Sequence, residues 1–231
     1  MTIQSDLSPY IEINPSSEAI GSVIWMHGLG ADANDFVPIA QELNLPDGIP
    51  LRFIFPNAPL RPITINNGYV MRAWYDITSM TKIEGHIDHH GINQSVNQIN
   101  ELIHREIERG ISSNKIVLAG FSQGALIALI AGLRFKNTLA GILALSGYLP
   151  YSTDDLTTQL TTANRNIPIF LGHGTEDTVV PYALGQYTND VLKKQGFDCS
   201  FHHYRMAHAV CPQEIDDIAE WVKKVFNLSY G

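Results

Sequence analysis

The stretch KIVLAGFSQGALIALIAGL, residues 115–133, decides the fold of this chain. It begins with an apolar run, 115–119, that has the length and composition of a buried strand, and residues 123–134 continue it as an apolar helix. Between the two lies GFSQG, residues 120–124, which matches the pattern G-x-S-x-G. A strand, a glycine-flanked serine and a helix in this order predict a sharp turn that exposes the Ser122 hydroxyl at the edge of a sheet.

The two glycines of this pattern have a physical reason. A turn this sharp brings the residues two positions before and after Ser122 against neighbouring backbone, so Gly120 and Gly124 avoid a collision. Ser122 then lies at a helix N-terminus, where unpaired N–H groups favour negative charge. The alternative is an ordinary serine at a glycine-flanked strand end, but the flanking strand and helix favour the reactive turn.

The hydrophobic residues 116–135 are also numerous enough to resemble a membrane span. Glycines and a Ser-Gln pair interrupt them, however, and the first four residues are typical of a strand. A strand, a tight turn and a buried helix explain the same hydrophobicity. We therefore expect no transmembrane segment.

Short apolar runs alternate with helical patterns along the rest of the chain. Further strands are predicted at 22–26, 51–55, 141–145, 167–171 and 199–204. Further helices are predicted at 34–43, 91–109, 182–194 and 212–226. Asn34 is expected to cap the first of these helices, and Pro212 to stand in the first turn of the last. Residues 56–90 are expected to be a long irregular stretch.

The alternation of strands and helices predicts a mostly parallel sheet with helices on both faces, in a single domain over residues 1–231. With the serine turn, this is the α/β-hydrolase fold. A serine hydroxyl is a poor nucleophile until a base takes its proton, and in this fold an acid and then a histidine follow the serine along the chain. Asp177 follows the strand at 167–171, and His208 follows the strand at 199–204. Both therefore lie in loops at the sheet edge where Ser122 is expected.

Other acids and histidines fit these two roles less well. Glu176 adjoins Asp177, but its side chain points another way and is expected to be solvated. His202 and His203 lie inside a predicted strand and do not reach the sheet edge. We expect His173 to brace the loop of Asp177, and His27 to order the turn at 28–30. The oxyanion of the reaction requires two N–H donors, which this fold predicts to be the backbone N–H groups of Gln123 and Leu29.

Composition excludes several kinds of partner. The net charge of −8 and a pI near 5.5 disfavour nucleic acid and strongly anionic membranes, although a neutral lipid or acyl chain stays open. Two cysteines imply no disulfide framework. The N-terminus has no signal-peptide pattern, so a cytoplasmic protein is expected. His86, Asp88, His89 and His90 match no common ligand spacing, so no metal site is expected.

Several motifs in order resemble one known family, the acyl-protein thioesterases, carboxylesterases and lysophospholipases among small α/β-hydrolases. They are HGLGAD (27–32), FPNAPLRPITINNG (55–68), MRAWYDI (71–77), GFSQGA (120–125), LALSGYLP (143–150), HGTEDTVVP (173–181) and the segment around His208. The resemblance implies the same Ser122, Asp177 and His208, no cofactor and no large lid. It also implies that the stretch 56–77 walls the acyl site. Its expected substrate-binding residues are Leu60, Ile63, Trp74, Leu149 and Val180.

The sequence thus predicts a hydrolase of short to medium carboxylic esters that works through an acyl-enzyme. The alternatives are an acyl-protein thioesterase or a lysophospholipase and, more remotely, an inactive hydrolase fold used as a binding module. A peptidase with the same three residues is a further alternative, but nothing suggests a gating domain. The expected partner is a small ester, thioester or lipid-acyl substrate. The oligomeric state, a homodimer included, is left open.

Overall fold

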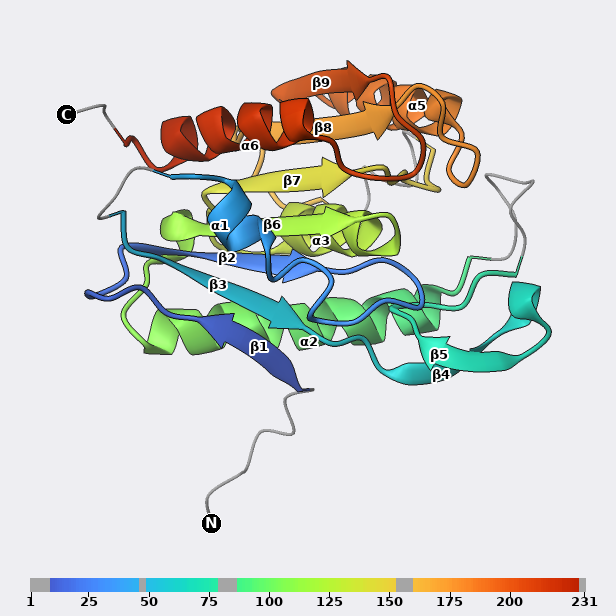
Figure 1. The fold of residues 1–231 in the computed structure, drawn as a ribbon, viewed down its shortest axis with the longest axis horizontal. Helices are drawn as coiled ribbons and strands as arrows, with labels where there is room; N and C mark the ends of the chain where they lie inside the picture. The colour runs from blue at the N-terminus through green and yellow to red at the C-terminus, as the bar shows by residue number, and fades with distance from the viewer. Residues whose placement is uncertain (1–8, 46–48, 79–86, 153–159, 229–231) are drawn as a thin grey trace, which may run out of the picture.

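One seven-stranded sheet organises the protein (Figure 1). The structure, a computed structural model, describes residues 9–45, 49–78, 87–152 and 160–228. The strand order is β1-β3-β2-β6-β7-β8-β9. Every neighbouring pair is parallel except β1 and β3. The strands are β1 (Tyr10–Ile13), β2 (Gly21–Met26), β3 (Leu51–Pro56), β6 (Ile116–Phe121), β7 (Gly141–Leu145), β8 (Ile169–Gly174) and β9 (Cys199–Tyr204). The mostly parallel sheet of the α/β-hydrolase prediction is confirmed.

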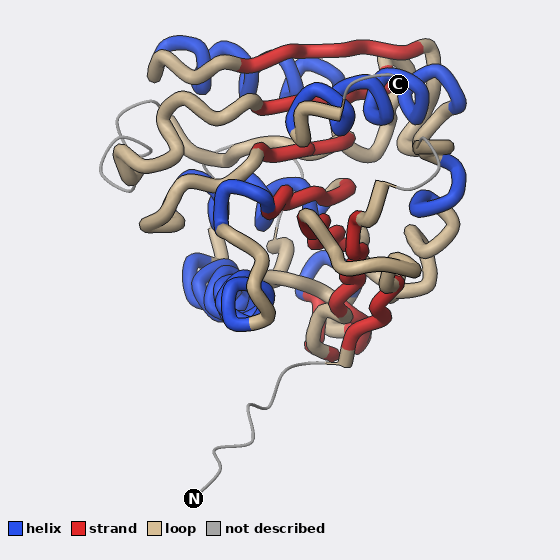
Figure 2. Tube along the Cα trace, turned by 90° about the vertical axis from the view of Figure 1, so that its left-hand side faces the viewer, coloured by secondary structure: helices blue, strands red, loops and turns tan. Residues whose placement is uncertain are grey.

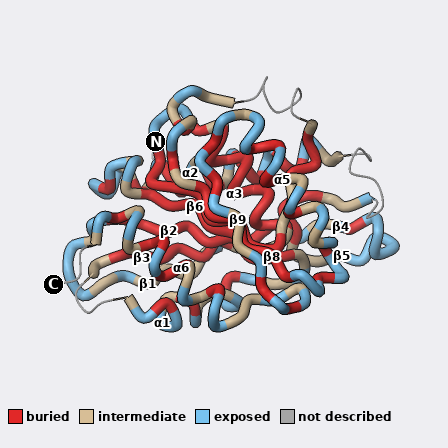
Figure 3. Tube along the Cα trace, turned by 90° about the horizontal axis from the view of Figure 1, so that it is seen from above, coloured by how far each residue is buried: buried red, intermediate tan, exposed pale blue. Residues whose placement is uncertain are grey.

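Helices cover both faces of this sheet, as Figures 1 and 2 show. They are α1 (Ile39–Glu42), α2 (His89–Glu108), α3 (Gln123–Arg134), α5 (Tyr182–Lys194) and α6 (Pro212–Val225). Successive strand residues point to opposite faces. Ile24 and Met26 therefore belong to the core under α2, α3 and α5, while Val23 and Trp25 belong to the core under α1 and α6. Seen from above in Figure 3, the buried segments lie at the middle of the molecule.

The helix ends follow local signals. Asp88 caps α2, because its side chain accepts a hydrogen bond from the Gly91 N–H at 2.8 Å. Pro212 stands in the first turn of α6, as predicted, where its missing N–H costs no intrahelical bond. Arg134 is the last residue of α3, which has the predicted bounds. No helix within the described ranges is both long and apolar enough to cross a membrane.

The first predicted helix is much shorter than expected. Residues 34–43 contain only α1, from Ile39 to Glu42, and Asn34 caps no helix. Pro38 explains the difference, because it has no N–H to give to the carbonyl of Asn34, four residues earlier. The segment instead forms turns, in which the Asp35 and Val37 N–H groups bond to carbonyls three residues earlier.

The stretch predicted to be irregular contains a hairpin. β4 (Leu60–Ile63) and β5 (Tyr69–Arg72) pair antiparallel, and a 3-10 turn, η1 (Thr64–Asn66), connects them. Asn67 adopts a left-handed conformation that closes the turn. A second 3-10 turn, η2 (Ser113–Lys115), leads into β6. The edge strand β1 was also not predicted, because its four half-buried residues carry no strong pattern.

A buried carboxyl stands where α6 packs on the sheet. Glu214 is fully buried, and neither of its carboxylate oxygens has a hydrogen-bond partner among the described residues. Its carboxyl occupies the space that a side chain at Gly172 would need. Burial first, and the charge of Asp217 second, raise the pKa of Glu214 to about 8. The carboxyl is therefore mostly protonated in the folded protein at neutral pH.

This shift predicts a pH-dependent stability. Between pH 4.5 and about 8 the folded protein keeps a proton on Glu214 that the unfolded chain has released, so the free energy of unfolding falls as pH rises through that window. The slope is at most about 1.4 kcal/mol per pH unit. Glu214→Gln should remove it, and denaturant unfolding at several pH values will measure the difference from wild type. Glu220→Gln, at an exposed position on the same helix, should keep the wild-type slope. If the free energy of unfolding changed with pH equally in wild type and Glu214→Gln, the raised pKa of Glu214 would be contradicted.

Candidate active site

Each of the three predicted catalytic residues lies shortly after the end of a strand. Ser122 directly follows β6, Asp177 follows β8 by three residues, and His208 follows β9 by four. Because β6, β8 and β9 run in the same direction, their carboxyl ends meet at one edge of the sheet. The structure therefore brings together the three residues that sequence order selects.

The turn at Ser122 is as sharp as the glycine pattern predicts, and its backbone is strained. Ser122 has φ 55° and ψ −115°, a positive φ that residues other than glycine rarely adopt. A side chain at Gly120 would collide with the carbonyl of Gly124, and one at Gly124 with the carbonyls of Met26 and His27. The turn is held by the Ser122 N–H, which donates to the carbonyl of Leu145 at 2.8 Å.

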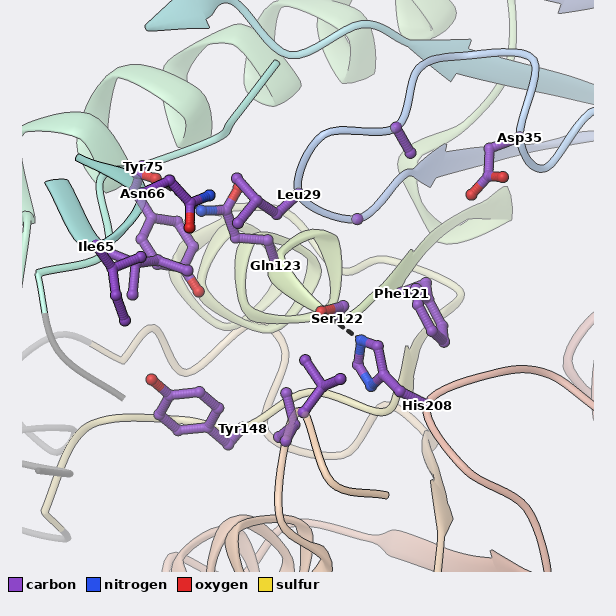
Figure 4. A pocket seen from close by; sticks show the side chains of 15 residues that line it. Leu29, Asp35, Ile65, Asn66, Tyr75, Phe121, Ser122, Gln123, Tyr148 and His208 are labelled. Atoms are coloured by element: carbon purple, nitrogen blue, oxygen red, sulfur yellow. Dashed lines mark hydrogen bonds between the residues drawn. The ribbon is translucent and has the colours of Figure 1, made fainter. Parts of the chain in front are cut away.

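A continuous chain of hydrogen bonds joins the three side chains. His208 Nε2 lies 2.9 Å from Ser122 Oγ, as the dashed line in Figure 4 marks, and its Nδ1 lies 2.7 Å from Asp177 Oδ2. A carboxylate only accepts hydrogen bonds, so Nδ1 carries a proton; with the single proton of a neutral ring at that nitrogen, Nε2 presents a lone pair to the serine hydroxyl. This tautomer is the one that can take the serine proton.

Asp177 is itself held by its own loop. Its Oδ1 accepts the Val179 and Val180 N–H groups, both at 2.8 Å, and its side chain is fully buried. His173 Nε2 donates to the carbonyl of Val180 at 2.9 Å, since a carbonyl only accepts. Burial lowers the pKa of His173, which keeps the ring neutral. His173 thus braces the Asp177 loop, in agreement with the prediction.

The competing residues lie elsewhere. Glu176 is exposed and pairs with Arg205 at 2.9 Å. His202 stacks on Phe170 with ring centroids 4.3 Å apart, and His203 is exposed on the same strand. None of them contacts His208 or Ser122 within the described residues, so the choice of Asp177 and His208 agrees with the geometry.

Both ring nitrogens of His27 bond to backbone groups rather than to Ser122. Its Nε2 accepts the Ala58 N–H at 3.1 Å, so its Nδ1 carries the proton and donates to the carbonyl of Gly28 at 2.7 Å. Burial lowers the pKa of His27, so the ring is neutral. This pair of bonds orders the turn that contains Leu29, as the sequence predicts for residues 28–30.

The two expected oxyanion donors lie next to Ser122. Leu29 and Gln123 both line the cavity into which Ser122 opens (Figure 4). Neither backbone N–H donates a hydrogen bond within the described part of the chain, so both are free for a substrate oxygen. The Gln123 side chain has a second role that the sequence does not reveal. Its Oε1 accepts the Trp74 N–H at 2.7 Å and its Nε2 donates to the carbonyl of Tyr75 at 2.6 Å.

The cavity at this site has a volume of about 440 Å³ and is mostly apolar. Val180, one of the predicted substrate-binding residues, belongs to its wall. The residues that line it are Gly28, Leu29, Ala31, Asp35, Ile65, Asn66, Tyr75, Ile77, Phe121, Ser122, Gln123, Tyr148, Val179, Val180 and His208.

Four of the predicted substrate-binding residues do not line this cavity. Trp74, Leu149 and Ile63 are fully buried, and Ile63 is the last residue of β4 in the hairpin. Trp74 faces inward because its Nε1 donates to the carbonyl of His27 at 2.8 Å. Leu60, in contrast, is 65% exposed on β4. The acyl-wall position that the sequence predicts for these four residues is therefore corrected.

Other residues make the wall instead. Phe121 and Tyr148 line the cavity, and each stands beside a strand end: Phe121 closes β6, and Tyr148 lies three residues beyond β7. This position at the carboxyl end of a strand is a signal that the sequence contains for both residues. Ile65, Tyr75 and Ile77 come from the hairpin and the segment after it. No periodicity marks which of their neighbours face the cavity.

No group of three or more histidine, cysteine or acidic side chains within the described ranges is arranged to hold a metal ion. Asp88 is engaged as the cap of α2, and its Oδ2 also accepts the Asp76 N–H at 2.9 Å. His86, considered with it as a ligand, lies outside the described residues.

Residues 10–226 match the Phospholipase/Carboxylesterase family. The chain belongs to this family. Acyl-protein thioesterase 1 of Cryptococcus neoformans is 34% identical over 231 residues, which cover 92% of this chain and 95% of that protein. Carboxylesterase SOBER1 of Arabidopsis thaliana is 31% identical over 204 residues, which cover 87% and 89%. The crystal structure of SOBER1 superposes with a TM-score of 0.83 over 89% of this chain and 98% of that one. The protein is a hydrolase of the carboxylesterase type.

Proposed function

We propose that the protein hydrolyses short to medium carboxylic esters, with Ser122 as nucleophile, His208 as general base and Asp177 as the group that orients His208. The observation that carries the proposal is the hydrogen-bond chain from Ser122 Oγ through His208 to Asp177, which opens into an apolar cavity. A serine without a catalytic role would not need an imidazole nitrogen 2.9 Å from its hydroxyl, with a buried carboxylate bonded to the other nitrogen of that ring.

The proposed reaction has two stages. His208 Nε2 takes the proton of Ser122 as Oγ bonds to the ester carbonyl carbon, and then gives that proton to the departing alcohol. A water molecule, deprotonated by the same nitrogen, then attacks the acyl carbon. The imidazolium returns the proton to Ser122 Oγ as the bond between the acyl carbon and Oγ breaks and the acid leaves. Asp177 stabilises the imidazolium without taking its proton. The free N–H groups of Leu29 and Gln123 would hold the oxyanion of each intermediate.

The relatives support two neighbouring substrate classes. One is named acyl-protein thioesterase, so a thioester is the first alternative. The family description includes phospholipases, so a lysophospholipid is the second. A catalytically silent binding module would have no use for the strain at Ser122 and the bonded imidazole. The single domain over residues 1–231, the cytoplasmic location and a homodimer stay predictions.

A rate series will test the proposal. Aryl esters and alkyl thioesters with acetyl, butanoyl, hexanoyl and octanoyl groups are to be compared by kcat/KM. Each methylene buried in the apolar cavity contributes up to about 0.8 kcal/mol, so kcat/KM for esters should rise up to about fourfold per methylene and level off when the cavity is full. A series in which thioesters alone are hydrolysed would favour the thioesterase. Covalent labelling by a fluorophosphonate, which needs an activated serine, separates any enzyme from a silent fold.

A further inference from the structure

Two tyrosine side chains enter the cavity from different parts of the chain. Tyr75 lies in the segment after β5, and Tyr148 lies after β7. Figure 4 shows their rings on opposite sides of one end of the cavity, with both hydroxyl groups directed into the space between them. A mostly apolar cavity thus has two phenol groups at one end, where Asn66 also belongs to the lining.

Neither hydroxyl has a hydrogen-bond partner in the part of the chain that the structure describes. The hydrogen bond that Tyr75 makes with Gln123 uses the backbone carbonyl of Tyr75, which accepts from Nε2, and leaves the hydroxyl out. Burial raises the pKa of both phenols, so each hydroxyl is neutral and able to donate. Tyr75 is only 8% exposed, which leaves the cavity as the space in which its hydroxyl can find a partner.

The position of His208 indicates which part of an ester lies near these phenols. His208 Nε2 must reach the leaving-group oxygen to protonate it, so the alcohol side of the ester lies toward His208. In Figure 4 His208 and Phe121 lie on one side of Ser122, whereas Tyr75 and Tyr148 lie on the other. The acyl chain therefore extends toward the two tyrosines.

An alkyl chain and an oxygen-bearing chain fit this end differently. In the free protein, water can satisfy the two hydroxyls. An alkyl chain displaces that water and leaves buried donors unpaired, which is unfavourable. An acyl chain with an oxygen at the right distance displaces the same water and accepts the hydrogen bonds instead. A site of this kind discriminates against the analogue that lacks the polar group.

We propose that Tyr75 and Tyr148 are specificity-determining residues that select acyl groups carrying an oxygen acceptor (an oxo, hydroxy or alkoxy group) along the chain, over unsubstituted alkyl acyl groups of equal length. The inference rests on the proposed esterase function of Ser122. It narrows the substrate class to esters of oxygenated carboxylic acids.

Aryl esters matched in length will test this inference. The aryl ester of hexanoic acid is compared with analogues in which an ether oxygen replaces one chain methylene, placed in turn at each position. The readout is the ratio of kcat/KM for the oxygenated and alkyl esters, measured in wild type, Tyr75→Phe and Tyr148→Phe. Because every enzyme acts on the same ester pair, the different intrinsic reactivities of the two esters cancel when the ratios are compared. Tyr69→Phe, at an exposed position outside the cavity, is the matched control.

For at least one position of the oxygen, the ratio should be about tenfold higher in wild type than in either cavity variant, as expected for one lost hydrogen bond. Tyr69→Phe should keep the wild-type ratio. Hydrolysis with the same ratio in wild type and both cavity variants, at every position of the oxygen, would overturn this inference and leave the esterase function standing. Hydrolysis of no ester above the background of Ser122→Ala would overturn the esterase function, and this inference with it.

Discussion

Replacing Ser122 with alanine is expected to lower kcat/KM for an aryl acetate by a factor of about 10⁴ or more. The hydroxyl that bonds to His208 Nε2 at 2.9 Å is the nucleophile of the first stage, and without it no acyl-enzyme forms. Steady-state rates on the purified variant will measure the loss. Alanine also fits the available space, so thermal unfolding should show an intact fold.

Ser146 offers a matched control for this substitution. It follows β7 at the same edge of the sheet, also has a positive φ of 47°, and is fully buried, but it does not line the cavity. Its hydroxyl has no hydrogen-bond partner within the described residues. Ser146→Ala should therefore keep nearly all activity. If Ser122→Ala retained wild-type rates, or if Ser146→Ala lost as much, the assignment of the nucleophile would be wrong.

Changing Asp177 to asparagine is expected to lower kcat by about 10³ to 10⁴ while preserving the fold. Asp177 Oδ1 accepts two backbone N–H groups, from Val179 and Val180, and Oδ2 faces one N–H of His208. The amide oxygen of the new asparagine is expected to accept the two backbone N–H groups, so that its NH₂ faces His208. The reverse orientation would point the NH₂ group at two N–H donors instead of one. That orientation favours the imidazole tautomer with the proton on Nε2, which cannot accept the proton of Ser122.

Glu176→Gln is the control for Asp177→Asn, since it makes the same chemical change at the neighbouring residue. Glu176 is exposed and pairs only with Arg205 in the described structure, so its loss should leave kcat unchanged within about twofold. Structural integrity of both variants is checked by thermal unfolding. Comparable losses in the two variants would indicate that the charge of the loop, rather than the orientation of His208, accounts for the effect of Asp177.

The elements that follow a simple hydrophobic period were predicted well, and those that do not were missed. The helix α3 and the strands β7 and β9 have the predicted bounds, because burial on one or both faces imposes a regular apolar pattern. The edge strand β1 and the hairpin β4–β5 carry no such pattern, since each is only partly buried. The prediction of a helix from Asn34 was wrong for a local reason. Pro38 prevents the helix from continuing through it, and the spacing of apolar residues does not show this.

Strand order, which can be read from the sequence, predicts the parts of the site that stand at strand ends. Ser122, Asp177 and His208 each follow a parallel strand. The carboxyl ends of parallel strands lie at one edge of the sheet, and this does not depend on the conformation of the loops. The cavity wall, in contrast, depends on contacts that form only in the folded protein. Trp74 is apolar, yet its hydrogen bonds to His27 and Gln123, 47 and 49 residues away in the chain, turn it into the core. Contacts between such distant residues leave no periodic trace in an irregular segment, so sequence alone could not separate Trp74 from its neighbour Tyr75, which lines the cavity.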